Sequence, residues 1–312
     1  MKRKGTVMKY LVIGAGGVGG AITAMFSRAK KDISLIARNE NLEKIKTSGL
    51  HFVSELFGNS TEKIRVFSQD EYTEKPDVIF VCTKYYSLNS IVPFLEKISD
   101  KNTIIIPILN GLTAGRELQK KLPETTVLDG CIYIVAFKSN LGEITHKSKY
   151  FKLVFGKRKN QSANDEILKQ IEKDINDTGI NGIFSNDIEK DAFEKFMLIS
   201  PYAASQIFYD KELGAMQKEG EERTTLLNLM KELKSLAKAM DIYVCDDIIE
   251  KNMKIIDSML PTTIASCYRD VKNNHPAEVE SLIFNVVKLG KEYKVETPTY
   301  EKIALSRKEY RN

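Results

Sequence analysis

The sequence contains no apolar run that approaches the roughly 20 residues needed to span a membrane as a helix. Its N-terminus, MKRKGTVMKYLVIGAG, also lacks the pattern of a signal peptide, because the apolar segment is short and continues directly into glycines. We therefore expect no membrane partner and a cytoplasmic location for the protein.

Clustered metal ligands are missing as well. The four cysteines form neither a CxxC pair nor a cysteine–histidine spacing that suits a metal ion. We expect no metal site, and we expect reduced thiols, as is usual inside cells, at Cys82, Cys131, Cys245 and Cys267.

Dense positive charge is also absent. The formal net charge is only +5, and the one basic cluster, GKRKN at residues 156–160, follows the strand-like FKLVF and suggests a solvated hairpin turn. A nucleic-acid-binding surface needs a more concentrated basic face. We therefore expect no nucleic-acid partner.

The 312 residues exceed what one ordinary hydrophobic core holds, and the hydrophobic pattern changes near residue 185. Before that point, continuous apolar segments alternate with helical patterns, which is typical of a parallel sheet covered by helices on both faces. The segments are strands at 9–13, 33–37, 77–81 and 103–108, helices at 19–29, 41–49 and 88–98, and further strands near 127–136, 151–155 and 180–184.

A glycine-rich turn follows the first predicted strand. The stretch YLVIGAGGVGGA places Gly14, Gly16 and Gly19 in G-x-G-x-x-G spacing between that strand and a helix. The first glycine permits a tight turn, the second lets a pyrophosphate approach the backbone, and the third lets helix and strand pack closely. In this strand–turn–helix context the motif predicts dinucleotide binding rather than a purely structural turn.

Residues 186–312 show helical periodicity without strand signals. The segment 221–240 places four leucines and Met240 along one helical face, and the segment 276–293 opens with a proline and an acidic first turn. The expected fold is therefore an α/β Rossmann-type domain with a mainly parallel sheet over residues 1–185, followed by an all-α domain over residues 186–312.

Arg38 stands at the end of the second predicted strand, in LIARNE. A site that prefers NAD usually carries Asp or Glu there to bind the ribose 2′-hydroxyl, whereas a guanidinium suits a 2′-phosphate. NADP(H) is therefore the favoured cofactor. NAD(H) stays the alternative, in which Arg38 only stacks on the adenine or faces solvent.

One lysine, Lys195, interrupts the apolar helical stretch AFEKFMLISPYAASQI at residues 192–207. An ammonium buried without a partner is costly, so a lysine in such surroundings often has a function. The alternative is a side chain that lays its stem on apolar surface and keeps its ammonium in water. The local pattern by itself favours this second interpretation.

Two further motifs follow strands of the predicted sheet: VCTK ends in Lys84, and ILNG contains Asn110. Further along, ASCYRDVKNNHPAEVESL places Ser266 and Glu278 twelve residues apart. Together with the glycine turn and Lys195, these pieces resemble the ketopantoate reductases (2-dehydropantoate 2-reductases) in order and spacing. The resemblance covers nearly the whole chain.

The resemblance implies that NAD(P)H reduces a 2-keto acid to an (R)-2-hydroxy acid, with 2-dehydropantoate to pantoate, in pantothenate biosynthesis, as the first candidate. It implies that Lys195 protonates the carbonyl oxygen and that Glu278 orients and tunes this lysine. It assigns Ser266 to substrate binding, and Lys84 and Asn110 to the cofactor and substrate cleft. Because hydride transfer builds negative charge on the carbonyl oxygen, a proton donor there lowers the barrier. These roles reverse the preference for a solvated lysine.

Two positions depart from the family pattern. Many members carry asparagines four and eight residues after the lysine, on the same helical face, and here those positions are Ile199 and Ala203. An apolar wall there suits a 2-keto acid with a branched or aromatic tail better than ketopantoate. Ser200 could supply a hydroxyl instead.

Three functions stay open. The first is the 2-keto-acid reductase, and the second is an NAD-dependent D-2-hydroxy-acid dehydrogenase of the same family that acts on substrates such as benzoylformate and mandelate. The third is a non-catalytic dinucleotide-binding sensor, which the joint presence of a proton donor and its neighbours disfavours. The expected partner of either enzyme is a small 2-keto acid or 2-hydroxy acid, and the oligomeric state, a homodimer included, stays open.

Overall fold

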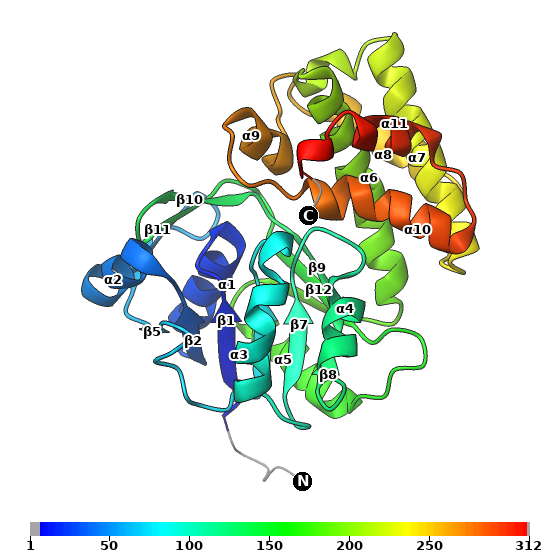
Figure 1. Ribbon diagram of the computed structural model, residues 1–312. Helices are drawn as coiled ribbons and strands as arrows, with labels where there is room; N and C mark the ends of the chain where they lie inside the picture. The colour runs from blue at the N-terminus through cyan, green and yellow to red at the C-terminus, as the bar shows by residue number, and fades with distance from the viewer. Residues whose placement is uncertain (1–6, 311–312) are drawn as a thin grey trace. The chain divides into compact units, whose positions relative to one another are not determined.

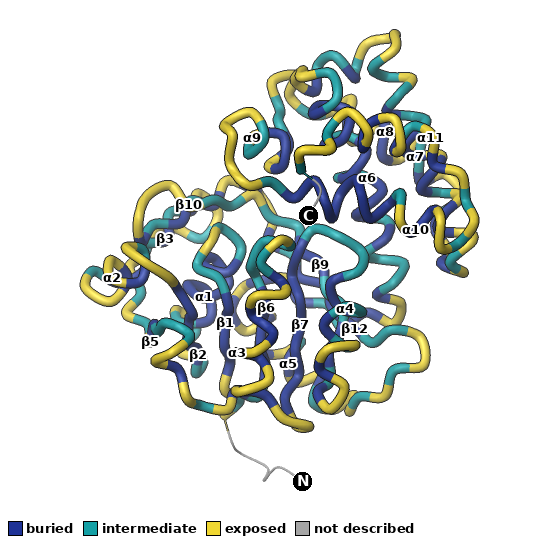
Figure 2. Tube along the Cα trace, in the orientation of Figure 1, coloured by how far each residue is buried: buried dark blue, intermediate teal, exposed yellow. Residues whose placement is uncertain are grey.

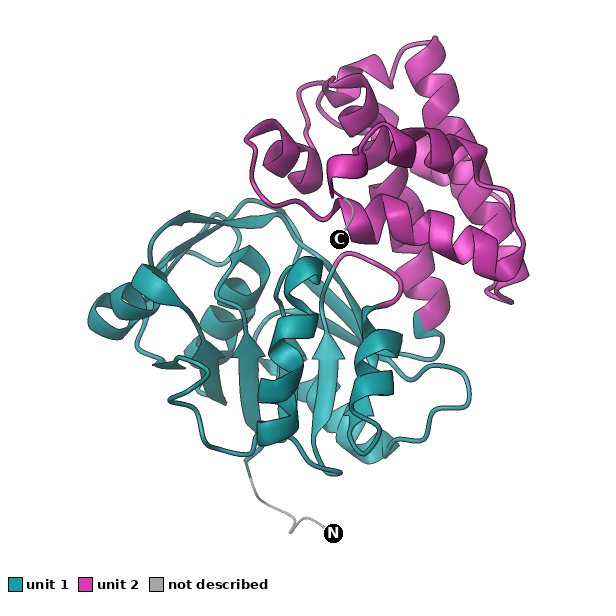
Figure 3. Ribbon diagram, viewed as in Figure 1, with its two compact units in different colours: residues 1–109, 114–188 teal, residues 110–113, 189–312 magenta. Residues whose placement is uncertain are grey.

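The computed structural model describes residues 7–310, and its contacts divide the chain into two units (Figure 1, Figure 3). The first unit comprises the chain up to Leu109 together with Ala114–Ile188. The second comprises Asn110–Thr113 together with the chain from Glu189 onward. The sequence suggested a single boundary at residue 185 and gave no sign that the segment 110–113 groups with the second unit.

A six-stranded, all-parallel sheet forms the centre of the first unit, in the order β5-β2-β1-β6-β7-β8. Its strands are β1 (Lys9–Ile13), β2 (Asp32–Ile36), β5 (Arg65–Phe67), β6 (Val78–Val81), β7 (Ile104–Pro107) and β8 (Thr126–Val127). All four residues of β6 and all four of β7 are buried, as expected for central strands covered on both faces.

Two apolar clusters cover the two faces of this sheet. On β1, Tyr10 and Val12 belong to a cluster that includes residues of α1 and α5, whereas Leu11 and Ile13 belong to one that includes residues of α3 and α4. A strand buried on both faces needs a continuous apolar run, which is why the sequence identified it. The helices of this unit are α1 (Gly17–Arg28), α2 (Asn39–Ser48), α3 (Val92–Ile98), α4 (Ala114–Lys121) and α5 (Asp165–Asp177), with short 3₁₀ turns η1 (Tyr85–Ser87) and η2 (Asn89–Ile91).

Two smaller sheets complete the first unit. A four-stranded sheet has the order β10-β11-β3-β4, and a three-stranded sheet has the order β13-β12-β9. Their strands are β3 (Leu50–Ser54), β4 (Ser60–Glu62), β9 (Asp129–Tyr133), β10 (Ala136–Asn140), β11 (Glu143–His146), β12 (Lys152–Gly156) and β13 (Asn181–Ser185). The sequence did not identify the four-stranded sheet, because its strands are short and partly polar.

The basic cluster at residues 156–160 is not a solvated hairpin turn, so that prediction was wrong. Strands β12 and β13 pair in parallel, and the chain between them passes through α5. The Arg158 guanidinium is only 10% exposed, and it donates to Asp129 Oδ1 at 2.9 Å and to the Val127 carbonyl oxygen at 2.6 Å. This arginine therefore ties the loop to the sheet.

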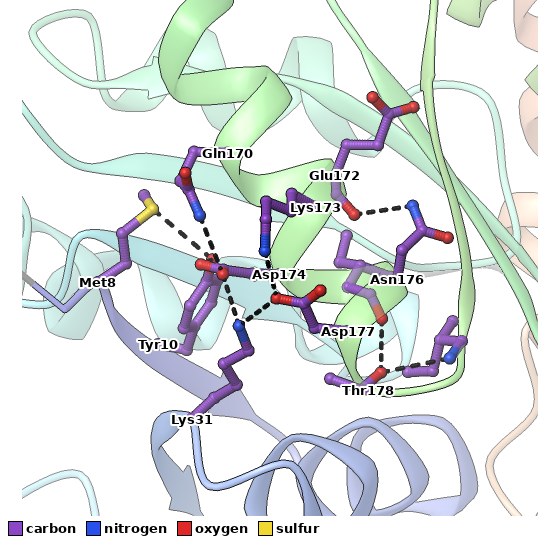
Figure 4. Close-up of polar contacts among 12 residues, drawn as sticks. Met8, Tyr10, Lys31, Gln170, Glu172, Lys173, Asp174, Asn176, Asp177 and Thr178 are labelled. Atoms are coloured by element: carbon purple, nitrogen blue, oxygen red, sulfur yellow. Dashed lines mark hydrogen bonds and ion pairs between the residues drawn. The ribbon is translucent and has the colours of Figure 1, made fainter.

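A partly buried polar cluster connects α5 with β1 and with Lys31, the residue before β2 (Figure 4). The Tyr10 hydroxyl donates to Asp174 Oδ2 at 2.6 Å, and the Lys31 ammonium donates to Asp174 Oδ1 at 2.7 Å and to Asp177 Oδ2 at 2.8 Å. Burial, and the neighbouring Asp174, raise the pKa of Tyr10 far above its usual value. The cluster lies at the start of β1, opposite the end that leads into the glycine turn, and its role is structural.

The second unit is helical. It contains α6 (Ile188–Tyr209), whose first residue the contacts assign to the first unit, and then α7 (Glu221–Ala239), α8 (Ile248–Ser258), α9 (Ser266–Lys272), a π-helix (Glu280–Phe284), α10 (Asn285–Tyr293) and α11 (Pro298–Leu305), with 3₁₀ turns at Leu213–Ala215 and Lys308–Tyr310. The helix predicted over 276–293 thus begins later and starts with a π-helical turn. The remaining architecture confirms the expected Rossmann-type domain followed by an all-α domain.

Burial follows this architecture within each unit. Figure 2 shows the strands β1, β6 and β7 and much of α6 as buried. Along residues 7–310 none of the helices combines the length and the apolar character that crossing a membrane requires.

Candidate active site

Two glycines of the turn after β1, Gly14 and Gly19, are required by the backbone conformation or by packing, whether or not a ligand is bound. Gly14 has a φ of +111°, and a Cβ there would lie 2.9 Å from the Cys82 carbonyl oxygen. A Cβ at Gly19 would lie 2.0 Å from the Gly14 carbonyl oxygen. Both positions therefore exclude any side chain, the first through its backbone conformation and both through close packing.

Gly16 is different, because a Cβ at this position would meet no atom within 4 Å. It precedes the first residue of α1, whose first turn carries no acidic side chain. The N-terminus of a helix offers unpaired N–H groups and a positive dipole end, which together favour a phosphate. The space that Gly16 leaves open therefore has room for a dinucleotide pyrophosphate, and binding of the pyrophosphate there stays a prediction.

Arg38 directly precedes α2 and is exposed at the end of β2.

The sequence did not predict the role of Asn41, three residues after Arg38, which links the glycine turn to the hairpin of β10 and β11. The Asn41 amide donates to the Ala15 carbonyl oxygen at 3.4 Å and accepts from the Gly142 N–H at 2.8 Å. Nothing in the local sequence distinguishes Asn41 from an ordinary residue of a helical first turn.

Lys84 lies after β6 and immediately before the 3₁₀ turn η1, and it is partly buried. The next residue fixes this turn, because the Tyr85 hydroxyl donates to Glu117 Oε1 of α4 at 2.5 Å. Lys84 thus leaves the sheet at the same carboxyl end from which the glycine turn emerges, which is where parallel α/β sheets bind their ligands.

Lys195 lies on α6, and the whole residue is only 9% exposed. Its ammonium donates a hydrogen bond of 3.1 Å to Asn110 Oδ1. Its neighbours Phe193, Phe196 and Met197 belong to the apolar core of the second unit. A lysine that extends its ammonium into water would be much more exposed, so the geometry disfavours the interpretation that the local sequence suggested.

Glu278 is 4% exposed and stands just before the π-helix. Its backbone carbonyl accepts from the Ser281 hydroxyl at 3.1 Å and from the Leu282 N–H at 3.2 Å. A carboxylate this deeply buried needs charged or hydrogen-bonding company. Its pairing with Lys195 stays a prediction.

Ser266 is exposed at the first position of α9, and hydrogen bonds with Gln206 of α6 and with Asp210, the residue after α6, hold the chain on both sides of it. The fully buried Gln206 donates to the Thr263 carbonyl oxygen and accepts from the Ala265 N–H, both at 2.8 Å. The Tyr268 hydroxyl donates to Asp210 Oδ1 at 2.9 Å. The same helix therefore carries Lys195 and anchors the segment of Ser266, which the sequence did not indicate.

The positions on the lysine face of α6 differ in burial. Ile199 is partly buried, whereas Ala203 is 1% exposed within the core of the second unit. Their contact with substrate stays a prediction. The suggestion that Ser200 supplies a hydroxyl to substrate was wrong, because its fully buried side chain donates to the Leu282 carbonyl oxygen and pairs with the Tyr300 hydroxyl, each at 2.6 Å.

Comparison with protein families decides the class of this site. The family described as "Ketopantoate reductase PanE/ApbA" matches residues 10–160, and its C-terminal counterpart matches residues 187–308. The chain belongs to the ketopantoate reductase family. It is therefore an NAD(P)-dependent oxidoreductase acting on CH–OH groups, and the hypothesis of a non-catalytic sensor is set aside.

Among residues 7–310 no group of three or more His, Cys, Asp or Glu side chains could hold a metal ion.

Relatives of this ketopantoate reductase family member align along most of their length. An uncharacterised oxidoreductase, YkpB of Bacillus subtilis, is 27% identical over 95% of this chain and 96% of its own. A 2-dehydropantoate 2-reductase of Nostoc is 24% identical over 93% of this chain and 91% of its own.

Solved structures of similar fold cover nearly the whole chain. A 2-dehydropantoate 2-reductase from Methylococcus capsulatus superposes with a TM-score of 0.87 at 23% identity, over 96% of both chains. A D-mandelate dehydrogenase with NADH and anilino(oxo)acetate gives 0.85 at 19% identity, over 96% of both chains. A dimeric ketopantoate reductase from Staphylococcus aureus gives 0.82 at 19% identity, over 97% of this chain and 98% of that one.

Proposed function

We propose that the protein reduces a 2-keto acid to the corresponding (R)-2-hydroxy acid with NADPH, and that 2-dehydropantoate is its first candidate substrate. The observation that carries this proposal is the buried Lys195 ammonium, which donates to Asn110 Oδ1 at 3.1 Å. An ammonium carries three N–H groups and is an acid, so a lysine at this position can donate a proton to a bound carbonyl group. A carbonyl oxygen that gains negative charge is such a partner.

The dinucleotide supplies the hydride when bound, and the glycine turn at the N-terminus of α1 is suited to hold its pyrophosphate. The chain's own chemistry concerns the oxygen. In the proposed reaction, Lys195 donates its proton to the substrate oxygen as the C–O π bond breaks and the new C–H bond forms. Asn110 orients the ammonium, and Ser266 binds the substrate. The Glu278 carboxylate favours the protonated form of Lys195. Lysine then regains its proton from solvent.

NADPH is proposed over NADH because of Arg38. This side chain is exposed at the end of β2, the position from which a residue reaches the ribose 2′ group in this type of domain. A guanidinium there can bind a 2′-phosphate through two hydrogen bonds, whereas a 2′-hydroxyl gives it no charge to bind.

A second candidate is an NAD-dependent D-2-hydroxy-acid dehydrogenase for branched or aromatic substrates. Ile199 and Ala203 favour it, because they leave the lysine face of α6 without hydrogen-bonding side chains at the fourth and eighth positions after Lys195. The likeness to the D-mandelate dehydrogenase with NADH adds support from the fold.

A homodimer is the proposed assembly, supported by the similarity in fold to the dimeric reductase of Staphylococcus aureus. Sedimentation equilibrium of the purified protein tests it directly. A mass of twice the 35.4 kDa chain is expected, and a monomer at micromolar concentration would contradict it.

Substrate and cofactor are tested together by following nicotinamide absorbance. The purified protein is mixed with NADPH or NADH and with ketopantoate, 2-ketoisovalerate, 2-ketoisocaproate or benzoylformate in turn. Highest kcat/KM for ketopantoate with NADPH supports the proposal. Highest kcat/KM for benzoylformate or 2-ketoisocaproate with NADH supports the second candidate instead.

A further inference from the structure

The segment Asn110–Thr113, here called the strap, leaves the first unit after β7 and joins the contacts of the second. The side-chain oxygen of Asn110 accepts a hydrogen bond from the Lys195 ammonium. Leu112 packs against the apolar core of the second unit. The position of that oxygen therefore depends on how the remaining strap residues are held.

Gly111 brings the backbone of the strap directly onto a helix. Its φ is +155°, and a Cβ at this position would lie 3.2 Å from the Ser281 Cβ. Such a distance is closer than an ordinary van der Waals contact, so a side chain at Gly111 would displace the strap from the helix. Asn110, the preceding residue, would be displaced with it.

The helix that receives the strap has an unusual local geometry. Ser281 lies in the π-helix Glu280–Phe284, all five residues of which are buried, and the Asn285 N–H bonds to the Glu280 carbonyl oxygen five residues earlier. π-Helical turns are rare and occur often at functional sites. A hydrogen bond from α6 stabilises this turn, because the buried Ser200 hydroxyl donates to the Leu282 carbonyl oxygen.

The residue that follows the π-helix holds the far end of the strap. Asn285, 6% exposed, donates from Nδ2 to Thr113 Oγ1 at 3.2 Å. Ser281 and Asn285 are four residues apart, about one helical turn, so both contact the strap from the same side. The strap is therefore held at three points, which are Asn110 by Lys195, Gly111 by Ser281 and Thr113 by Asn285.

We propose that the Asn285–Thr113 hydrogen bond and the Gly111–Ser281 contact fix Asn110 so that its oxygen sets the direction of the Lys195 ammonium. Thr113 and Asn285 are then positioning residues, since they act on the lysine through Asn110. The inference rests on the proposed role of Lys195 as proton donor. A misplacement of a reacting group by about 1 Å can cost roughly 100-fold in rate. A shift of the four-residue strap that moves Asn110, and with it the Lys195 ammonium, should therefore lower kcat measurably.

Thr113→Val tests the inference because it removes the hydroxyl while nearly keeping the shape of the side chain. We expect kcat to fall roughly 3- to 10-fold, as for the loss of one hydrogen bond, with the KM for NADPH unchanged. The alkaline limb of the kcat profile should move to lower pH, because the ammonium loses a fixed acceptor. Thr113→Ser, which keeps a hydroxyl, should restore most of kcat and the profile.

Thr225→Val is the matched control. Thr225 is another half-buried threonine of the second unit, and its hydroxyl pairs with the Tyr209 hydroxyl at 2.8 Å, outside the strap. It should keep the kcat and the pH profile of the unaltered protein. An equal loss of kcat in Thr225→Val and Thr113→Val would overturn the inference, and so would an unchanged profile in Thr113→Val.

A double-mutant cycle tests whether the loss of kcat comes from the hydrogen bond between Thr113 and Asn285. It also covers the case in which Thr113→Val folds poorly. Asn285→Ala and the double variant are measured alongside it, with Tm recorded for each. If the two residues act through one hydrogen bond, their effects on kcat are non-additive. Fully additive effects would contradict the inference. Activity in Lys195→Ala would instead remove the proposed proton donor, which is a separate failure.

Discussion

Lys195 and Asn110 are 85 residues apart in the chain, and a hydrogen bond of 3.1 Å joins the ammonium of the first to the side-chain oxygen of the second. The lysine comes from the long helix α6, and the asparagine comes from a segment that directly follows β7. The hydrogen bond therefore joins a buried ammonium on α6 to an amide oxygen from the segment Asn110–Thr113.

The glycines of the turn should separate binding from folding. Gly16→Ala introduces a methyl that meets no protein atom, so Tm should stay within about 1 °C of the unaltered protein while NADPH binding weakens about tenfold, or about 1.4 kcal/mol. Gly19→Ala forces a Cβ to 2.0 Å from a backbone oxygen and should destabilise the fold by about 1–3 kcal/mol. Cofactor fluorescence titration and thermal melts measure the two effects. Equal NADPH affinity in Gly16→Ala and the unaltered protein would contradict the pyrophosphate assignment.

Arg38 should set the cofactor preference. Arg38→Asp replaces a guanidinium that suits a 2′-phosphate by a carboxylate that repels it and can accept from a 2′-hydroxyl. We expect the NADPH/NADH ratio of kcat/KM to fall at least about tenfold, which corresponds to about 1.4 kcal/mol. Lys169→Asp, the same charge change at an exposed position of α5, is the control. An unchanged ratio in Arg38→Asp would remove this residue from cofactor recognition.

The polar cluster at α5 should give the fold an acid-labile component (Figure 4). Hydrogen bonds from Lys173 and Lys31 lower the pKa of Asp177 from 3.8 to about 2. A carboxyl with a depressed native pKa stabilises the fold above its unfolded pKa, and this contribution is lost as pH falls from about 4 towards 2. In urea melts, Asp177→Asn should be less stable than the unaltered protein at pH 6, and the difference should shrink by pH 2.5. A difference that is constant with pH would contradict the account.

The fold could be predicted from the sequence where burial is complete. Strands β1 and β6 are covered on both faces, so the sequence YLVI after Lys9 in β1 and the sequence VIFV of β6 are continuously apolar. Strands β4 and β10, with sequences STE and AFKSN, are the two edge strands of a partly exposed sheet and lack that signal. The π-helix was also unpredictable, because a single wide turn in a buried segment leaves the apolar pattern unchanged.

The candidate site was predictable only in part. Gly14 and Gly19 follow from the local motif, since the need for glycine there is local and steric. Family resemblance named Lys195 and Asn110 as site residues, but it did not predict the hydrogen bond between them, because no local pattern relates residues so far apart. The pair of Asn285 and Thr113 is 172 residues apart and carries no sequence signal that would identify it. Side-chain packing in three dimensions is the information that the sequence pattern lacks.

The central claim is that Lys195 is the proton donor, and steady-state reduction of the best 2-keto acid by Lys195→Ala tests it most directly. Loss of a general acid typically costs 100- to 10,000-fold, so we expect kcat to fall by about that range while NADPH still binds. Lys190→Ala, on the same helix with its ammonium 5.3 Å from the Tyr243 ring centre, serves as the control and should keep its activity. A Lys195→Ala enzyme with kcat within about threefold of the unaltered protein would contradict the account.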